Sequence, residues 1–175
     1  MARDLFSEHG FDATTMQEIA DAAGLHKSSL YHHYRSKEAL LEAVCLEVLD
    51  LLDQSLQVAL AAPEPSLRER FLAAFDGAVT AALDDPATTN VILSNRGSSD
   101  FGRLVQQRRR SYEQGFVALA REAQEAGEIR SDIEPELLVR LVLGMVNWAV
   151  TWFDPARYTA TDIRRAVSKL AAEGI

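Results

Sequence analysis

Cysteine is almost absent from this sequence, in which Cys45 is the single cysteine among 175 residues. One cysteine can form neither an internal disulfide nor a cysteine-rich zinc site, so both are excluded. The sequence also lacks an apolar run of the roughly 18 residues that cross a membrane. Its first ten residues, MARDLFSEHG, carry acids where a secretory signal needs an apolar stretch. We therefore expect a cytoplasmic protein without a membrane segment.

Helix-breaking residues are also scarce, with 5 Pro and 9 Gly, whereas 47% of the residues are apolar. No segment alternates apolar and polar residues as a half-buried strand does. A chain of this length can bury a core without disulfides or metals. The composition therefore predicts an all-α fold.

Positive charge is in deficit, because the net charge is −8 and residues 1–45 hold 4 basic against 7 acidic residues. This balance argues against a protein that binds nucleic acid with most of its surface. Residues 24–37 are the exception, since they contain Lys27, Arg35 and Lys37 and no acid. They form a basic island in an acidic chain.

Two short helices are predicted around this island. Thr15 and Glu18 have the spacing of a capping box, which predicts a helix from Met16 to about Ala23. Gly24 supplies the left-handed position that ends it, and a second helix follows over residues 27–34. Two short helices joined by a glycine-containing turn are the outline of a helix-turn-helix.

Longer helices are predicted for the rest of the chain. A helix capped by Ser36 runs to Ala62, ahead of Pro63, and spans about 35 Å at about 1.5 Å per residue. Capping residues and apolar spacing predict further helices over residues 66–83, 87–96, 100–126 and 135–153, and a last one from 159 onward.

Three of the four histidines lie at positions 26, 32 and 33, which raises the question of a metal site or acid-base catalysis. His32 and His33 are adjacent and point about 100° apart on a helix, so they cannot chelate one ion together. Ser28 and Ser29 lack both a nucleophile elbow and an acid that would orient a histidine. We predict no metal, no cofactor and no enzymatic activity.

Contact with DNA explains more of the basic island. Lys27 and His32 lie on the outward side of the second short helix, where they can reach base edges in the major groove, and Lys37 can meet a phosphate. The alternative is a short solvated helix that simply carries polar residues. Charge and spacing alone leave these two interpretations evenly balanced.

The segment GFDATTMQEIADAAGLHKSSLYHHYRSKEALLEAV resembles the DNA-binding headpiece of TetR-family transcriptional regulators. The resemblance covers residues 5–44 and includes the GF pair, the two threonines, the AG turn, the LY pair and K-x-x-LL. It implies base-reading positions at Gln17, Lys27, Ser28, Ser29 and His32. It implies phosphate-contacting positions at Thr15, Tyr31, His33 and Lys37. We therefore expect Lys37→Ala to weaken binding to all DNA alike, and changes at Lys27 or His32 to alter sequence preference.

The resemblance also implies a helix-turn-helix DNA-binding domain over residues 1–45 and a helical ligand-binding and dimerisation domain over residues 46–175. The function it implies is that of a homodimeric repressor released from a palindromic operator by a small molecule. The first helix is shorter than is usual in the family. The alternative hypothesis is therefore a small-molecule-binding or interaction protein whose DNA binding is impaired.

The dimer interface is expected on the helix over 135–153 and on the last helix. The first of these is apolar around most of its circumference and needs partners on both sides. A central core helix in a monomer is the alternative. A two-fold dimer would place two headpieces on half-sites one helical turn apart, about 34 Å.

The ligand pocket is predicted beside the helix over 100–126. Arg108 falls in the apolar stripe of that helix, so it needs an anion, which is either a carboxylate of a neighbouring helix or a group of the ligand. Arg109 and Arg110 face elsewhere and are expected to be solvated. The predicted ligand contacts are Phe71, Phe75, Val79, Phe101, Val105, Arg108, Tyr112, Phe116, Asn147, Trp148 and Trp152. The segments RRRSYEQGF and LVLGMVNWAVTWF are similar to TetR regulators that sense acyl-CoA thioesters, which implies an acyl-CoA effector.

Overall fold

The computed structural model describes residues 1–61, 66–95, 97 and 99–174. Their regular secondary structure is entirely helical, which confirms the predicted all-α fold. The helices are α1 (Ala2–His9), α2 (Met16–Ala22), α3 (Lys27–His33), α4 (Lys37–Ala61), α5 (Leu67–Asp84), α6 (Pro86–Ser94), α7 (Asp100–Glu125), α8 (Pro135–Trp152) and α9 (Ala160–Gly174). The predicted bounds of α2 to α9 agree with these to within about two residues. The predicted ends at positions 62 and 96 lie outside the described residues.

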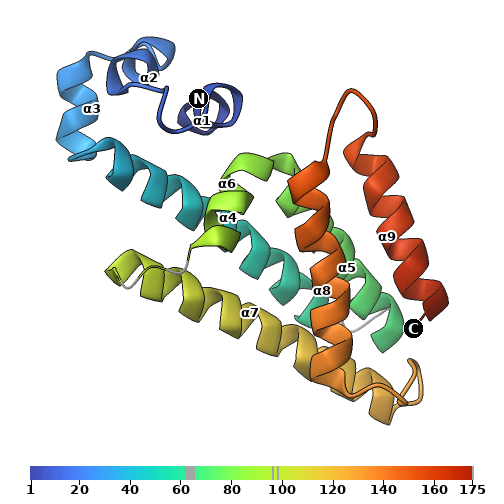
Figure 1. Cartoon of the computed structure of the whole chain (residues 1–175). Coiled ribbons are helices and arrows are strands. Elements are labelled where there is room, and N and C mark those ends of the chain that lie inside the picture. Colours follow the sequence, from blue (N-terminus) through green and yellow to red (C-terminus); the bar gives the residue numbers. More distant parts are fainter. Residues whose placement is uncertain (62–65, 96, 98, 175) are drawn as a thin grey trace.

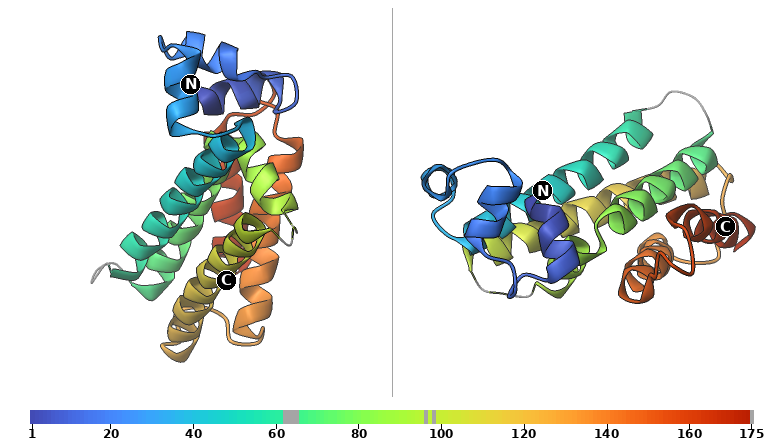
Figure 2. Two further views of the ribbon diagram at one scale, coloured as in Figure 1. Left: turned by 90° about the vertical axis from the view of Figure 1, so that its left-hand side faces the viewer. Right: turned by 90° about the horizontal axis from the view of Figure 1, so that it is seen from above.

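Three helices, α1 to α3, form a headpiece at one end of the molecule (Figure 1). The long helix α4 leaves this headpiece and runs into the helical body, where it packs against α5 and α7. The pair α8 and α9 lies at the end far from α3 (Figure 1). Figure 2 shows the headpiece seated on top of the bundle of long helices. A single continuous helix therefore connects the two parts.

Capping fixes the helix starts that the sequence predicted. The Thr15 hydroxyl accepts a hydrogen bond from the backbone N–H of Glu18 at 3.2 Å, and the Glu18 carboxylate accepts one from the backbone N–H of Thr15 at 2.7 Å. These hydrogen bonds from Thr15 lower the pKa of Glu18. Ser66 and Glu69 form a second complete capping box at the start of α5. Gly24, with φ of +66°, provides the turn between α2 and α3, which most L-residues would adopt only with strain.

The headpiece has a small apolar core of its own. Its buried members are Phe6, Met16, Ile19, Ala20, Leu30 and Leu40. Ala2 and Leu5 of α1 pack against it, so the short first helix covers part of this core. Leu40 belongs to α4, and the long helix is thereby anchored in the headpiece by packing.

A buried junction joins α4, α6 and α7 below the headpiece. Cys45, Val48, Leu49, Ile92 and Val105 form this cluster. Burial raises the pKa of the Cys45 thiol to about 12, and the nearby carboxylate of Asp85 adds to the shift. The thiol is therefore kept both inaccessible and protonated at neutral pH.

We expect Cys45 to resist alkylation by iodoacetamide at pH 8 in the folded chain and to react fully in guanidinium chloride. The reason is that labelling needs both access and thiolate, and the junction denies both. Intact-mass measurement over time gives the ratio of the two rates. Rapid labelling of the folded chain would show that the junction of α4, α6 and α7 opens readily.

Candidate DNA-binding surface and ligand cavity

The helix α3 is exposed at every residue except Leu30, which is the one side chain it contributes to the headpiece core. Its exposed residues include Lys27, Ser28, Ser29, Tyr31, His32 and His33, all of which the sequence predicted as DNA contacts. The helix carries no acidic side chain. A helix held by one buried residue and presenting donors on its outer side has the form that enters a major groove.

Several contacts order the side chains on this surface. The Lys27 ammonium lies 5.9 Å from the centroid of the Tyr31 ring. The rings of His32 and His33 meet edge to face at 5.6 Å between centroids. On α2 the exposed Gln17 donates to the Asp21 carboxylate at 2.7 Å. These contacts leave the predicted base-reading side chains at the surface, and their binding to DNA stays a prediction.

Lys37 has a different environment from the one its predicted phosphate contact requires. Its ammonium donates to the backbone carbonyls of Phe11 at 2.6 Å, Asp12 at 3.2 Å and Thr14 at 2.9 Å. It also lies 4.4 Å from the centroid of the Phe11 ring. A lysine ammonium has three donors, and all three are used here. Lys37 therefore ties the start of α4 to the loop between α1 and α2, and its contact with a phosphate stays a prediction.

A cavity of about 500 Å³ lies in the body, bounded by α4, α5, α6, α7 and α8. Its apolar wall consists of Leu49, Leu52, Ala78, Ala82, Ile92, Leu93, Leu143 and Val146. Its polar side chains are Asp53, Thr89, Asn95, Gln106, Arg109, Arg110, Tyr112, Glu113, Arg140 and Asn147. A cavity of this size that joins an apolar wall to convergent polar side chains can hold a small molecule.

Two of the predicted ligand contacts, Tyr112 and Asn147, line this cavity. Burial raises the pKa of the Tyr112 phenol, so this side chain stays neutral. Most of the others belong to the core: the fully buried side chains are Phe71, Phe75, Val79, Val105 and Phe116. The sequence correctly predicted the apolar face of α7, but apart from Tyr112 its side chains pack against other helices and do not line the cavity. Phe101 packs against the Cys45 cluster.

The two tryptophans of α8 also lie away from the cavity wall. Trp148 is 68% exposed and Trp152 is 45% exposed. They share the outer face of α8 with the exposed Leu137 and Leu141. Their predicted role as pocket residues has no support in this geometry, whereas the predicted apolar surface for a partner is present.

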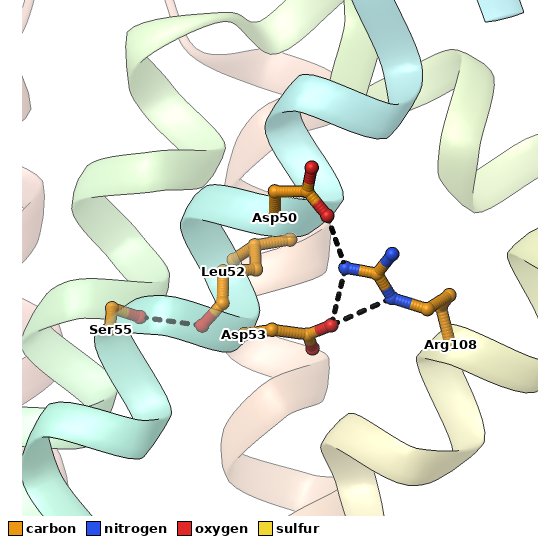
Figure 3. A network of polar contacts seen from close by, with 5 residues as sticks. All are labelled: Asp50, Leu52, Asp53, Ser55 and Arg108. Atoms are coloured by element: carbon orange, nitrogen blue, oxygen red, sulfur yellow. Dashed lines mark hydrogen bonds and ion pairs between the residues drawn. The ribbon is translucent and has the colours of Figure 1, made fainter. Parts of the chain in front are cut away.

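The anion that Arg108 needs comes from α4 (Figure 3). Arg108 donates from Nε to Asp53 at 2.7 Å and from Nη2 to Asp50 at 2.7 Å. The hydrogen bond with Asp50 is the main reason that the pKa of Arg108 is raised. Of the two alternatives for this residue, the carboxylates of a neighbouring helix are correct, and Arg108 joins α7 to α4 instead of lining the cavity.

Sequence reasoning missed the arginines that do line the cavity. Arg110 is exposed, as expected, and Arg109 is half-buried, but both also contribute to the wall, and Arg140 joins them from α8. Arg140 donates from Nε to the Glu113 carboxylate at 2.7 Å. One signal was available, because Arg140 is the single charged residue between Glu136 and Asp154 in a strongly apolar segment.

The cavity and the headpiece are linked through α6. Its inner side supplies Thr89, Ile92 and Leu93 to the cavity wall. At its start, the Asp85 carboxylate accepts from the backbone N–H of Thr88 at 3.0 Å, and its other oxygen lies 3.5 Å from Nε of Arg3 in α1. Asp85 is only 2% exposed. A buried carboxylate therefore connects the start of α6 to the headpiece.

Two further features bear on function. Among the described residues, no three His, Cys, Asp or Glu side chains come close enough together to hold a metal ion. In the same part of the chain, none of the helices has the length and apolar character needed to span a membrane.

Comparison with known proteins gives two matches to family models. Residues 1–44 match the model described as bacterial regulatory proteins, tetR family. Residues 64–175 match the model described as tetracyclin repressor-like, C-terminal domain. The two matches fall on either side of the middle of α4, so one covers the headpiece and the other most of the helical body.

Relatives support the same assignment. The chain is 31% identical over 164 residues to the HTH-type transcriptional repressor KstR2 of Mycolicibacterium smegmatis, covering 89% of this chain and 77% of that protein. It is similar to the crystal structure of the TetR family regulator PfmR of Thermus thermophilus, with a TM-score of 0.83, 30% identity, and coverage of 99% and 96%. It is also similar to AibR, whose structure contains isovaleryl coenzyme A and operator DNA, with a TM-score of 0.77, 26% identity, and coverage of 97% and 92%.

Proposed function

Because this chain belongs to the TetR family of bacterial transcriptional regulators, we propose that it is a homodimeric repressor released from a palindromic operator by a small molecule. Its place of action is then the bacterial cytoplasm, where the operator DNA lies. The domains proposed for these two tasks are residues 1–45 for DNA binding and residues 46–175 for ligand binding and dimerisation. The chain is a ligand-responsive DNA-binding regulator, whether it represses or activates transcription.

The observation that carries this proposal is the course of α4. The helix supplies Leu49, Leu52 and Asp53 to the cavity, and its first residue, Lys37, is hydrogen-bonded to the loop ahead of α2. A ligand that displaces α4 at the cavity therefore moves the headpiece that carries α3. In a dimer this motion changes the spacing between two recognition helices, which have to match half-sites about 34 Å apart.

The outer surface of α8 and α9 supports the dimer. Leu137, Leu141 and Trp148 follow one another along α8, and Leu170 of α9 adds to the same exposed apolar set. An apolar stripe of this kind is rarely left to water in a monomer. Two copies related by a two-fold axis would bury it in a four-helix interface.

The cavity supports an acyl-CoA thioester as the effector. Its apolar wall suits an acyl chain, and Arg109, Arg110 and Arg140 offer positive charge to an anionic portion. The similarity to AibR, which was crystallised with isovaleryl coenzyme A, points the same way. A thermal-shift screen of acyl-CoA esters identifies the chain length, since a ligand that binds only the folded state raises the Tm.

A gel-shift experiment with DNA upstream of its reading frame tests the proposed function. We expect a retarded complex that disappears when the effector found by thermal shift is added. A chain extended at its N-terminus is tested in parallel, to show whether the short α1 weakens DNA binding. Binding by neither chain would refute the repressor and favour the alternative hypothesis, a small-molecule-binding or interaction protein with impaired DNA binding.

The contact between Arg3 and Asp85 is proposed to couple the ligand to the headpiece. Asp85→Asn keeps an oxygen that can cap α6 and removes the charge that faces Arg3. We expect the variant to bind operator DNA normally, while the factor by which the effector weakens that binding falls about fivefold, a typical size for coupling between sites. Titrating DNA with and without effector measures this factor.

Asp84→Asn is the matched control, because Asp84 is the exposed neighbour of Asp85 and undergoes the same change of charge. The control should behave as wild type in both titrations. Equal responses of the two variants would refute the coupling role of Asp85.

A further inference from the structure

A second cavity, of about 460 Å³, lies along α7 and α8 next to the first. The two cavities share three lining residues, Arg110, Glu113 and Arg140. The ion pair between Arg140 and Glu113, with 2.7 Å between Nε and Oε1, joins α7 to α8 at this common boundary. The boundary between the cavities is thus made by side chains that can move.

The second cavity carries more positive than negative charge. Arg121 pairs with Glu136 at 3.3 Å, and Arg140 pairs with Glu113. The remaining arginine, Arg110, is exposed and has no hydrogen-bond or ion-pair partner in the part of the chain that the structure describes. One guanidinium is therefore uncompensated in a chain whose net charge is −8. This excess of positive charge favours the binding of an anion at the boundary of the two cavities.

The lining residues extend from Gln106 to Arg121 on α7, which corresponds to about 22 Å along the helix axis at about 1.5 Å per residue. The apolar wall belongs to the first cavity, whereas Arg110 and Arg140 lie at its boundary with the second cavity and Arg121 lies in the second cavity alone. An elongated ligand with an apolar tail and an anionic head fits this order. A compact apolar ligand would leave the second cavity unused.

We propose that Arg110 and Arg140 bind the phosphate groups of the thioester effector and that Glu113 occupies Arg140 until the ligand displaces it; this rests on the proposed function. Guanidinium groups bind phosphates through two parallel hydrogen bonds, and a phosphate carries more charge than the single carboxylate it replaces. The Arg140 side chain is 69% exposed and that of Glu113 33% exposed, so water screens this pair and its exchange for a ligand phosphate costs little. Because Glu113 competes with the ligand for Arg140, it sets the ligand concentration at which the repressor leaves the operator DNA.

The test compares octanoyl-CoA with S-octanoylpantetheine, by isothermal titration calorimetry on the full chain. The second ligand carries the same thioester and acyl chain but lacks the phosphates together with the adenosine, so the arginine variants assign the difference to the phosphates. We expect Arg110→Gln and Arg140→Gln each to weaken octanoyl-CoA binding about tenfold and to leave S-octanoylpantetheine binding unchanged. We expect Glu113→Gln to tighten octanoyl-CoA binding about threefold, because the competing carboxylate is gone. Arg35→Gln, an exposed arginine of the headpiece, is the matched control and should change neither.

Three other outcomes would contradict the proposal, each for a different reason. Equal affinity of the wild-type chain for both ligands means that phosphates are not recognised, while the thioester class survives. Weaker octanoyl-CoA binding by Glu113→Gln means that Glu113 orients Arg140 instead of competing for it. If neither ligand binds, the thioester class fails with the proposal, and the gel shift still decides the repressor function independently.

Discussion

Lys37→Ala is expected to unfold the headpiece partially and thereby to weaken its DNA binding, an outcome that a lost phosphate contact alone would not give. The substitution leaves the carbonyls of Phe11, Asp12 and Thr14 without their donor. It also removes the cation from the Phe11 ring. We expect a loss of about 2 kcal/mol in headpiece stability, since hydrogen bonds to charged groups are worth about 1.5–3 kcal/mol when buried and these are partly exposed.

Two measurements separate this structural role from a direct DNA contact. Hydrogen exchange should show lost protection in α2 and α3, while α5 and α8 keep theirs. Fluorescence anisotropy should show DNA affinity at least about tenfold weaker, because the start of α4 is no longer held to the loop between α1 and α2. Binding of ligand in the cavity should be unaffected.

Lys27→Ala is the matched control for this substitution. It removes the same charge from an exposed side chain whose nearest recorded contact is the Tyr31 ring. DNA affinity should fall and sequence preference should change, while hydrogen exchange stays as in the wild type. If Lys37→Ala weakened DNA binding but left hydrogen exchange unchanged, the phosphate contact expected from the sequence would explain the loss.

Leu141→Glu is expected to convert the proposed dimer to a monomer and to reduce operator binding by at least about 100-fold. Leu141 is 56% exposed and lies between Leu137 and Trp148 on the outer face of α8. A two-fold interface would bring two introduced carboxylates together in an apolar setting, and loss of a central anchor typically costs 2 kcal/mol or more. Each headpiece would then bind alone, without the gain of about 100-fold or more that linkage provides.

Sedimentation velocity and gel shift measure the two consequences. Val58→Glu is the control, because Val58 is an equally exposed apolar residue, at 67%, on α4 and outside the proposed interface. It should remain dimeric and bind DNA normally. A Leu141→Glu chain that stayed dimeric would place the interface elsewhere and refute the proposed role of α8.

The headpiece was largely predictable because its signals are local. The capping box of Thr15 and Glu18, the left-handed Gly24 and the single buried residue of α3 follow from short-range backbone geometry. The carboxylate partner of Arg108 was also anticipated as one of two alternatives, since a guanidinium in an apolar stripe needs an anion. Which helix supplied it, α4 through Asp50 and Asp53, depended on packing.

The cavity was predicted poorly for a physical reason. Periodicity identifies which side chains of a helix avoid water, but core and cavity wall are equally apolar, so it cannot separate Phe116 from Leu143. The aromatic cluster of Phe71, Phe75 and Phe116 fills the space where a pocket was expected, with 4.8 Å between the ring centroids of Phe75 and each of the other two. Arg109 and Arg110 were not predicted to line the cavity because the position of α8 beside α7 was unknown.

The sequence by itself determined the all-helical fold and the helix-turn-helix, because capping, turn chemistry and apolar spacing act within a few residues. The resemblance of the headpiece segment to the TetR family could also be seen in the sequence alone. Only the tertiary structure decided where Lys37 directs its donors, which side of α7 faces the cavity, and that Arg140 and Glu113 meet between the two cavities. These outcomes depend on groups far apart in the chain. Their positions follow from how long helices pack against one another, which no local pattern specifies.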